Sequence, residues 1–142
     1  MQHQEVAWTN DLKVGDMRTI KFRARRTDGK KGFNLKEQQF TDLVYGSLFT
    51  GRIGANLYYL IEDEDCNEYE VDKNTICQYT NLKDENDEEL YEGDTISLLD
   101  NTYKIMYDTK ICAFVLDKPF RNTDKNTPIG VILNDLAFQI VE

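Results

Sequence analysis

Apolar and polar residues alternate with a period of two along much of the chain, and residues 18–24 show this most clearly. The polar and apolar positions of that segment interleave, as Arg18, Lys21 and Arg23 against Ile20, Phe22 and Ala24. Such alternation is typical of a strand with one face buried. The outward face of this strand would carry a basic stripe.

Other short segments combine the same alternation with β-branched and aromatic residues, and they predict further strands. We expect these at residues 43–49, 55–61, 68–71, 75–80, 95–99, 102–107, 112–116, 129–133 and 137–141. Turn-forming residues predict turns or loops at residues 27–32, 51–54, 62–67 and 100–101. Residues 82–92 predict an irregular connection with Asn86-Asp87 at a tight turn, and short helices fit only residues 35–43 and 134–139.

Eight or more short strands without a long helical pattern predict an all-β, mainly antiparallel fold with at most two short helices. A small barrel and a sandwich both fit this pattern. The segment Glu92-Gly93-Asp94-Thr95-Ile96 favours a barrel with SH3-like elements, because a Gly-Asp pair lets the chain turn sharply into a strand. In that strand we expect Ile96 and Leu98 to face inward. A second Gly-Asp pair, Gly15-Asp16, precedes the first strand.

The length of 142 residues suits one domain. No apolar run approaches the roughly 18 residues that a membrane-spanning helix needs, and the first residues lack the pattern of a signal peptide. We therefore expect a soluble, cytosolic protein without membrane contact. Cys66, Cys77 and Cys112 lie far apart and form no Cys-x-x-Cys pair, so we expect free thiols.

Charge divides the chain into two parts. The net charge is -9, yet the first 60 residues hold 10 Lys and Arg against 6 Asp and Glu. The acidic excess lies in two runs, residues 62–72 and residues 84–94. From these runs we select the following candidate partner-binding residues: Glu62, Asp63, Glu64, Asp65, Glu68, Asp84, Glu85, Asp87, Glu88 and Glu89. The basic stripe gives candidate nucleic-acid or subunit contacts at Lys21, Arg23, Arg25, Arg26, Lys30 and Lys31. Overall acidity disfavours nonspecific nucleic-acid binding and favours a basic partner or self-association.

Catalytic groups are scarce. His3 is the single histidine and lies near the terminus, so no Ser-His-Asp, Cys-His or histidine metal site can be assembled. The order Asp84-x-Asn86-x-Glu88 resembles the start of a calcium loop, but it lacks that loop's glycine and distal ligand. We predict no enzymatic activity, no cofactor and no metal. The many tyrosines suit core packing better than a base-stacking surface.

A long segment of the chain resembles a family motif. Residues 78–96, QYTNLKDENDEELYEGDTI, resemble the QYTGLKDKNGKEIYEGDII signature of the YopX-like proteins of phages and prophages. Residues 17–25, MRTIKFRAR, are similar to the usual start of that family, and residues 44–48 fit its next block. The resemblance covers roughly residues 17–115. It divides the chain into an N-terminal extension, residues 1–16, and a YopX-like β domain, residues 17–142.

Two positions depart from the signature. Asn81 stands where relatives carry glycine, and Asn86-Asp87 stands where they carry Asn-Gly. Both replacements tolerate a left-handed backbone, so we expect the turns to persist.

The resemblance implies a phage or prophage protein acting in the cytoplasm of a bacterial host cell. We expect a noncatalytic accessory protein that acts through protein contacts and forms homo-oligomers. One alternative is an acidic inhibitor of a host nucleic-acid-binding defence system, because a negative surface can occupy a basic channel. The other is a small nucleic-acid-binding barrel that uses the stripe from Lys21 to Lys31.

Overall fold

The computed structural model describes residues 18–34 and 38–141. Residues 1–16, and with them the second Gly-Asp pair, lie outside that part. The strands are β1 (Phe22–Arg25), β2 (Gly32–Asn34), β3 (Gln39–Thr41), β4 (Leu43–Ile53), β5 (Asn56–Glu62), β6 (Glu68–Glu70), β7 (Cys77–Lys83), β8 (Glu89–Tyr91), β9 (Thr95–Leu98), β10 (Asn101–Asp108), β11 (Ala113–Leu116) and β12 (Gln139–Val141). The described helices are the 3-10 helix η2 (Lys73–Thr75) and the α-helix α2 (Ile129–Leu133).

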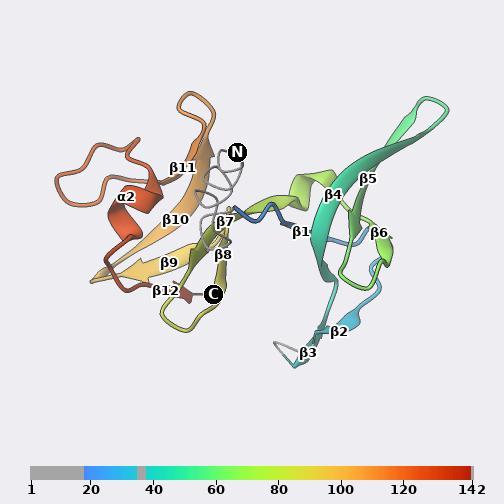
Figure 1. Cartoon of the computed structure of the whole chain (residues 1–142), viewed down its shortest axis with the longest axis horizontal. Coiled ribbons are helices and arrows are strands. Elements are labelled where there is room, and N and C mark those ends of the chain that lie inside the picture. Colours follow the sequence, from blue (N-terminus) through green and yellow to red (C-terminus); the bar gives the residue numbers. More distant parts are fainter. Residues whose placement is uncertain (1–17, 35–37, 142) are drawn as a thin grey trace, which may run out of the picture.

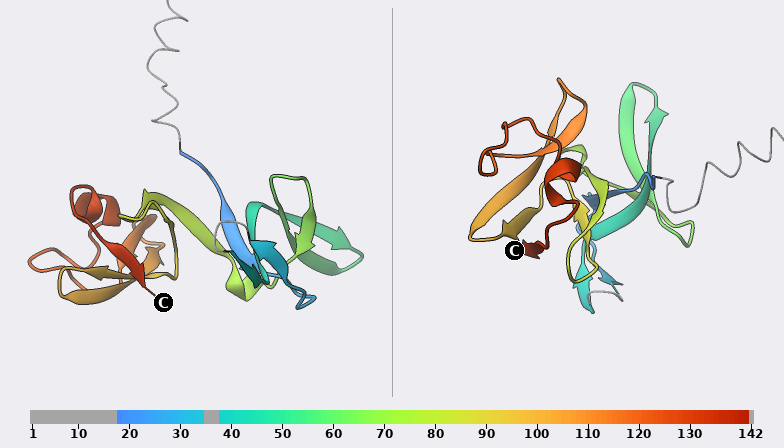
Figure 2. Two further views of the ribbon diagram at one scale, coloured as in Figure 1. Left: turned by 90° about the horizontal axis from the view of Figure 1, so that it is seen from below. Right: turned by 60° about the vertical axis from the view of Figure 1, so that its left-hand side comes forward.

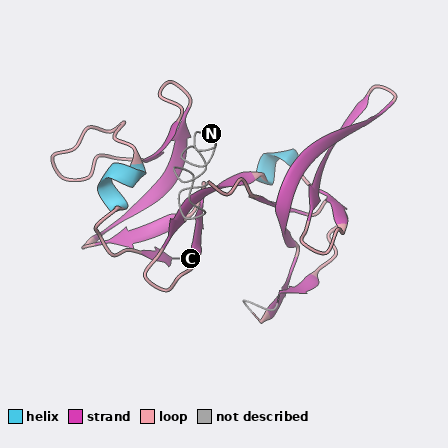
Figure 3. Cartoon of the chain, in the orientation of Figure 1, coloured by secondary structure: helices cyan, strands magenta, loops and turns pink. Residues whose placement is uncertain are grey.

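The strands form a six-stranded sheet of order β6-β5-β4-β1-β7-β8, a four-stranded sheet of order β11-β10-β9-β12, and the small β2-β3 hairpin. Every strand pairing is antiparallel. Figure 3 shows how little helix accompanies them. The predicted all-β, mainly antiparallel class is therefore confirmed.

The six-stranded sheet curls towards a barrel without closing. Val71, just after β6, donates its N–H to the Tyr59 carbonyl at 2.9 Å and bridges Arg26 at the end of β1. The two sides of the sheet thus meet through one isolated bridge rather than a continuous ladder. The expectation of a barrel is correct for the curl and wrong for closure.

The described chain forms two lobes (Figures 1 and 2), and each lobe has its own hydrophobic cluster. The first lobe comprises β1 to β6 with η2, and its fully buried cluster is Ala24, Ile61 and Val71. The second lobe comprises β8 to β12 with α2 and holds eleven buried residues. Strand β7 joins the lobes, because its start pairs with β1 and its later part pairs with β8.

The helix predictions are wrong in position. Residues 129–133, predicted as a strand, form α2, in which Ile129, Ile132 and Leu133 are buried. That i, i+3, i+4 spacing belongs to a helix, but a five-residue apolar run does not distinguish the two periods. In place of the expected helix at residues 35–43, the described residues form β3 and the start of β4, and Phe33 and Phe40 pack edge to face across the β2-β3 hairpin.

Several strand limits also differ from the expectation. The first strand begins at Phe22 rather than residue 18, because Thr19 turns away to bind Asn81. Strand β4 runs through residues 51–53 without interruption, and the chain turns at Gly54-Ala55. The β9-β10 turn lies at Leu99-Asp100, one residue before the predicted pair. Residues 82–92 include the ends of an antiparallel β7-β8 hairpin rather than a wholly irregular connection.

One glycine of the first lobe is fixed by a close approach of two strands. A Cβ added to Gly46 on β4 would lie 1.9 Å from the carbonyl oxygen of Glu62 on β5. No side chain fits at that distance, so the close approach of β4 and β5 requires glycine at this position.

Candidate interaction surfaces

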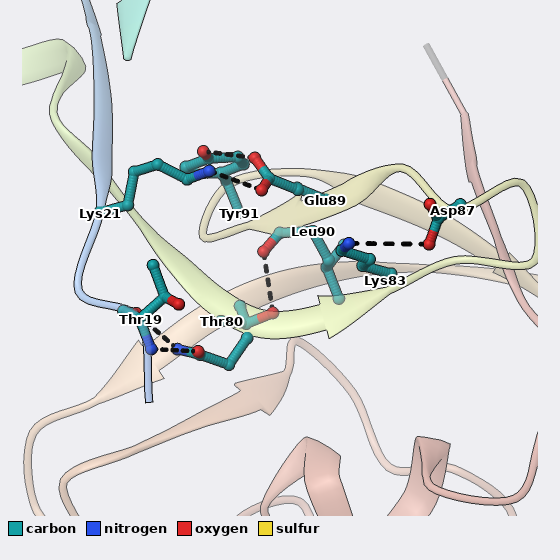
Figure 4. Close-up of polar contacts among 9 residues, drawn as sticks. Thr19, Lys21, Thr80, Lys83, Asp87, Glu89, Leu90 and Tyr91 are labelled. Carbon is teal, nitrogen blue, oxygen red and sulfur yellow. Dashed lines mark hydrogen bonds and ion pairs between the residues drawn. The ribbon is translucent and has the colours of Figure 1, made fainter. Parts of the chain in front are cut away.

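Ion pairs between the basic stripe and the second acidic run connect β1 and the residue before it to the later part of the signature segment. Lys21 Nζ lies 2.5 Å from Glu89 Oε2, and an Arg23 guanidinium nitrogen lies 2.6 Å from Asp94 Oδ1. Figure 4 shows Lys21 and the Tyr91 hydroxyl converging on the Glu89 carboxylate. Basic and acidic parts of the sequence therefore meet within one chain.

Three tyrosines pack under these pairs. The ring of Tyr91 lies 5.7 Å from that of Tyr45 and 5.4 Å from that of Tyr79, measured between centroids. Arg23 lies over the Tyr91 ring at 4.8 Å and Lys21 over the Tyr79 ring at 5.2 Å. Each cation thus has a carboxylate partner and an aromatic face.

The surroundings favour the charged form of Arg23 and the neutral form of the Tyr91 phenol. Burial alone would lower the pKa of Arg23, but the hydrogen bond and charge of Asp94 outweigh it and raise the pKa. Burial, followed by the Glu89 carboxylate, raises the pKa of Tyr91 far above its usual range. The Tyr91 hydroxyl therefore remains a hydrogen-bond donor to Glu89, at 3.0 Å.

The signature turns keep the geometry that the sequence predicts. Asn81 has a φ of 71° and Asp87 a φ of 65°, so both adopt the left-handed backbone. The Asn81 side chain also accepts from the Thr19 N–H at 2.7 Å and donates to the Thr19 carbonyl at 2.9 Å. Asparagine thus supplies two contacts that glycine could not make.

The carboxylate of Asp84 organises the β7-β8 turn. Its Oδ1 accepts from the backbone N–H groups of Asn86 and Glu88, and its Oδ2 accepts from that of Ile140 on β12. Asp84 is buried, with 7% of its surface exposed. Its neighbour Glu85 contacts the Gln139 side chain. Asp84 is therefore a structural residue that ties the β7-β8 turn to β12. Of the five acidic candidates between Asp84 and Glu89, only Glu85, Asp87 and Glu88 are exposed.

The first acidic run forms the β5-β6 hairpin loop, and its members have unequal roles. Asp63 accepts hydrogen bonds from the N–H groups of Asp65 and Asn67 and from the Tyr69 hydroxyl. Burial alone would raise the pKa of Asp63, but these hydrogen bonds outweigh it and lower the pKa. Asp63 shapes the loop, whereas Glu64, Asp65 and Glu68 are exposed and Glu62 is half-buried.

The remaining basic candidates are mostly neutralised within the first lobe. Arg25 pairs with Asp42, and Arg26 pairs with Asp28 at 2.7 Å while covering the Tyr69 ring at 4.7 Å. Lys30 and Lys31 are exposed, and no ion pair involves them among residues 18–34 and 38–141. The structure does not assemble the six basic residues into one open surface.

A groove of about 590 Å³ lies in the first lobe. Its walls carry both signs of charge and come from β1, β5 and the β6-η2 connection; the residues that line it include Arg25, Asp42, Tyr58, Glu70, Asp72 and Lys73. Asp72 caps η2 through the Asn74 N–H, and Asp42 pairs with Arg25. Most of the charged groups at this groove thus already have partners.

The described residues show no cluster of three or more His, Cys, Asp or Glu side chains that could hold a metal ion. The three cysteines are free thiols, as predicted. Burial raises the pKa of the Cys77 thiol in spite of nearby Arg23, so this sulfur is protonated at neutral pH. Among the helices that the structure describes, none has the length and apolar character needed to cross a membrane.

Sequence reasoning missed the partners that neutralise the stripe. Asp42 and Asp28 lie outside the two acidic runs, and Asp94 pairs with an arginine 71 residues away. Alternation along β1 was the one available signal, since it places Arg23 and Arg25 on the same face. It does not reveal which carboxylates approach that face.

Strands β4, β1, β7 and β8 lie side by side around these tyrosines and ion pairs. The chain is thus an all-β protein in which the signature segment, through β7, connects the two lobes. The family model described as YopX protein matches residues 21–133, which is most of the chain. The chain therefore belongs to the YopX family, and this makes it a phage-type protein. No curated protein matches it.

Proposed function

We propose that this protein acts noncatalytically, through protein contacts, and assembles as a homo-oligomer. The observation that carries the proposal is the internal pairing of Lys21, Arg23, Arg25 and Arg26 with carboxylates. Because these four cations are paired within the chain, they are less available to nucleic-acid phosphates. The chain as a whole has a net charge of -9, so its surface carries an excess of acidic groups. Such a surface repels nucleic acid and attracts basic proteins.

A second candidate function is inhibition of a basic host nucleic-acid-binding protein, such as an anti-restriction or anti-CRISPR activity. The exposed side chains of Glu64, Asp65 and Glu68 on one hairpin loop favour it. Asp63 holds that loop in a defined shape, so the carboxylates are presented by an ordered turn. Charge complementarity of this kind acts mainly on the association rate.

The third candidate, nucleic-acid binding through the stripe, has less support. Arg23 is half-buried and paired with Asp94, and Lys21 is half-buried and paired with Glu89. Exposing these groups to phosphate would break pairs that are partly shielded from solvent, which is unfavourable.

The proposal is tested by quantitative affinity capture from infected host cells. The probes are the full chain, a loop variant carrying Glu64→Gln, Asp65→Asn and Glu68→Gln, and a control variant carrying Asp100→Asn, Asp124→Asn and Asp135→Asn. All six side chains are exposed, so the two variants change charge equally, and Asp63 is retained. Each capture is repeated after nuclease treatment.

We expect a basic protein whose capture falls with the loop variant, persists with the control variant and survives nuclease. Equal capture by both variants would remove the role of this loop. Capture that disappears on nuclease treatment would instead support nucleic-acid binding.

A further inference from the structure

The outer part of the β4-β5 hairpin extends beyond the rest of its sheet (Figures 1 and 2). Pairing of β4 with β1 stops at Gly46, and pairing of β5 with β6 stops at Leu60. We call residues 47–58 the arm. Within the described chain the arm is a two-stranded ribbon, and isolated two-stranded ribbons are only marginally stable in water.

The arm differs from the rest of the chain in charge. Arg52 is the single charged residue between Asp42 and Glu62, in a protein of which 30% of residues are charged. Large apolar side chains are exposed on it: Phe49 is 38% exposed, Leu57 is 41% exposed and Ile53 is 70% exposed. The arm is therefore an apolar and weakly positive surface on an acidic molecule.

The backbone of β4 also presents an open edge. The Tyr59 carbonyl accepts from Val71, so Tyr59 directs its backbone groups away from β4. Thr50 lies opposite Tyr59 and must likewise direct its N–H and C=O groups to the other side. Leu48 and Arg52, two residues before and after, share this direction, and no described residue pairs with them there.

We propose that two copies of this chain associate through this open edge, with β4 of one copy antiparallel to β4 of the other across a two-fold axis at Thr50. This names the contact surface of the homo-oligomer in the proposed function and rests on that function. The arrangement adds six backbone hydrogen bonds in principle, since three facing residue pairs each exchange two. It joins the two curved sheets into one continuous sheet.

The side chains of the arm suit this register. Thr50 faces Thr50 of the second copy. Leu48 faces Arg52 of the second copy, so the two Arg52 side chains are kept apart. Phe49 faces Gly51 of the second copy, where the absence of a side chain leaves room for a ring. Each Phe49 also lies diagonal to the other Phe49, a spacing within the reach of aromatic side chains.

Electrostatics favour the arm over other contact surfaces between two copies. Two molecules of charge -9 repel one another, and the repulsion is weakest where acidic groups are absent. The contact is a short strand pair, at the small end of interface sizes, so we expect weak association that requires micromolar or higher concentrations.

The test measures the oligomeric state of the full chain by sedimentation from about 1 μM to about 1 mM. Thr50 is exposed on β4, and the two-fold register places it against itself. Thr50→Lys and Thr50→Glu should each weaken self-association at least tenfold, because like charges then face each other. An equimolar mixture of these two variants should restore dimers, and Thr50→Val should behave as the parent.

A second variant tests the backbone. Thr50→Pro removes an N–H that points away from β5, so the arm itself should remain paired while the dimer loses two hydrogen bonds. We expect association about tenfold to a hundredfold weaker than the parent. Circular dichroism and amide exchange in the second lobe serve as folding controls.

The possible failures are distinguishable. A parent chain that stays monomeric throughout would overturn both the homo-oligomer and this contact. If the parent and every Thr50 variant self-associate equally well, the homo-oligomer remains and the arm contact is overturned. If dimers return when Thr50→Lys and Thr50→Glu are mixed, and neither variant dimerises by itself, the register with Thr50 facing Thr50 is established.

Discussion

The two lobes are held together by different interactions. The second lobe buries eleven residues from four strands, α2 and the connecting segments, including Ile96, Ile105 and Leu116. Among the residues that the structure describes, the buried cluster of the first lobe is Ala24, Ile61 and Val71, with half-buried residues around them. Its remaining contacts are backbone pairs, ion pairs and cation-aromatic contacts such as Arg26 over Tyr69.

The difference indicates that folding stability is concentrated in the second lobe. Burial of apolar surface contributes more per residue than partly exposed ion pairs, which are worth up to about 1 kcal/mol each. The first lobe instead keeps exposed strand edges, such as that of β4. We therefore expect amide hydrogens of β4 and β5 to exchange before those of β9 and β10.

The largest expected effect on stability comes from the close approach of β4 and β5 at Gly46. Gly46→Ala should destabilise the first lobe by about 3 kcal/mol or more, since the new Cβ would lie 1.9 Å from the Glu62 carbonyl oxygen. Urea unfolding monitored in both lobes measures the effect. Gly32→Ala is the control, because no atom lies within 4 Å of its added Cβ. Equal stability of the two variants would show that the backbone around Gly46 and Glu62 can shift to accommodate the added methyl group.

A matched pair of core substitutions compares the lobes directly. Ile61 and Ile105 are both fully buried, in the small and the large cluster respectively. Truncation to Ala typically costs about 2–5 kcal/mol, depending on how far the surroundings collapse. We expect Ile105→Ala near the upper end and Ile61→Ala near the lower end in denaturant unfolding. A larger loss for Ile61→Ala would reverse the assignment of stability to the second lobe.

The sequence predicted the features of this fold that depend on neighbouring residues. Ile96 and Leu98 face inward because period-two alternation encodes the face of a strand directly. Asn81 and Asp87 adopt left-handed turns because their short polar side chains tolerate that backbone. The signature therefore encodes local geometry that survives substitution.

Features that depend on distant residues were not predictable in the same way. Arg23 belongs to the basic stripe in the sequence, yet its partner Asp94 comes from the turn before β9. The open edge of β4 exists because β1 ends its pairing at Gly46, which no local pattern reveals. Five apolar residues form α2 rather than a strand because tertiary packing decides short ambiguous runs.

A smaller loss of stability is expected when the contact between the β7-β8 turn and β12 is weakened. Asp84→Asn retains one oxygen but loses the charged acceptor for the N–H groups of Asn86, Glu88 and Ile140. We expect a loss of about 1–3 kcal/mol and faster amide exchange at Ile140. Asp87→Asn is the control, since the Asp87 side chain is 85% exposed and its pair with Lys83 spans 3.7 Å. Unchanged exchange at Ile140 would show that this contact does not hold the hairpin.

The smallest expected effect lies in the acidic loop of the first lobe and depends on pH. Hydrogen bonds lower the pKa of Asp63 in the folded state, so its contribution to stability is present above the ordinary pKa and is lost as pH falls through the folded-state pKa. Because the loop is largely solvated, we expect well under about 1 kcal/mol.

Asp63→Asn should therefore reduce the stability of the first lobe at neutral pH and flatten its dependence on pH in the acidic range. Asp65→Asn serves as the control, because Asp65 contributes its backbone N–H rather than its carboxylate to the Asp63 turn. Unfolding of β5 and β6, followed by amide exchange between about pH 5 and about pH 2, measures both variants. If both variants and the parent lose stability with the same slope, Asp63 does not shape the loop. Asp63 would then be equivalent to Asp65 in its effect on the stability of the first lobe.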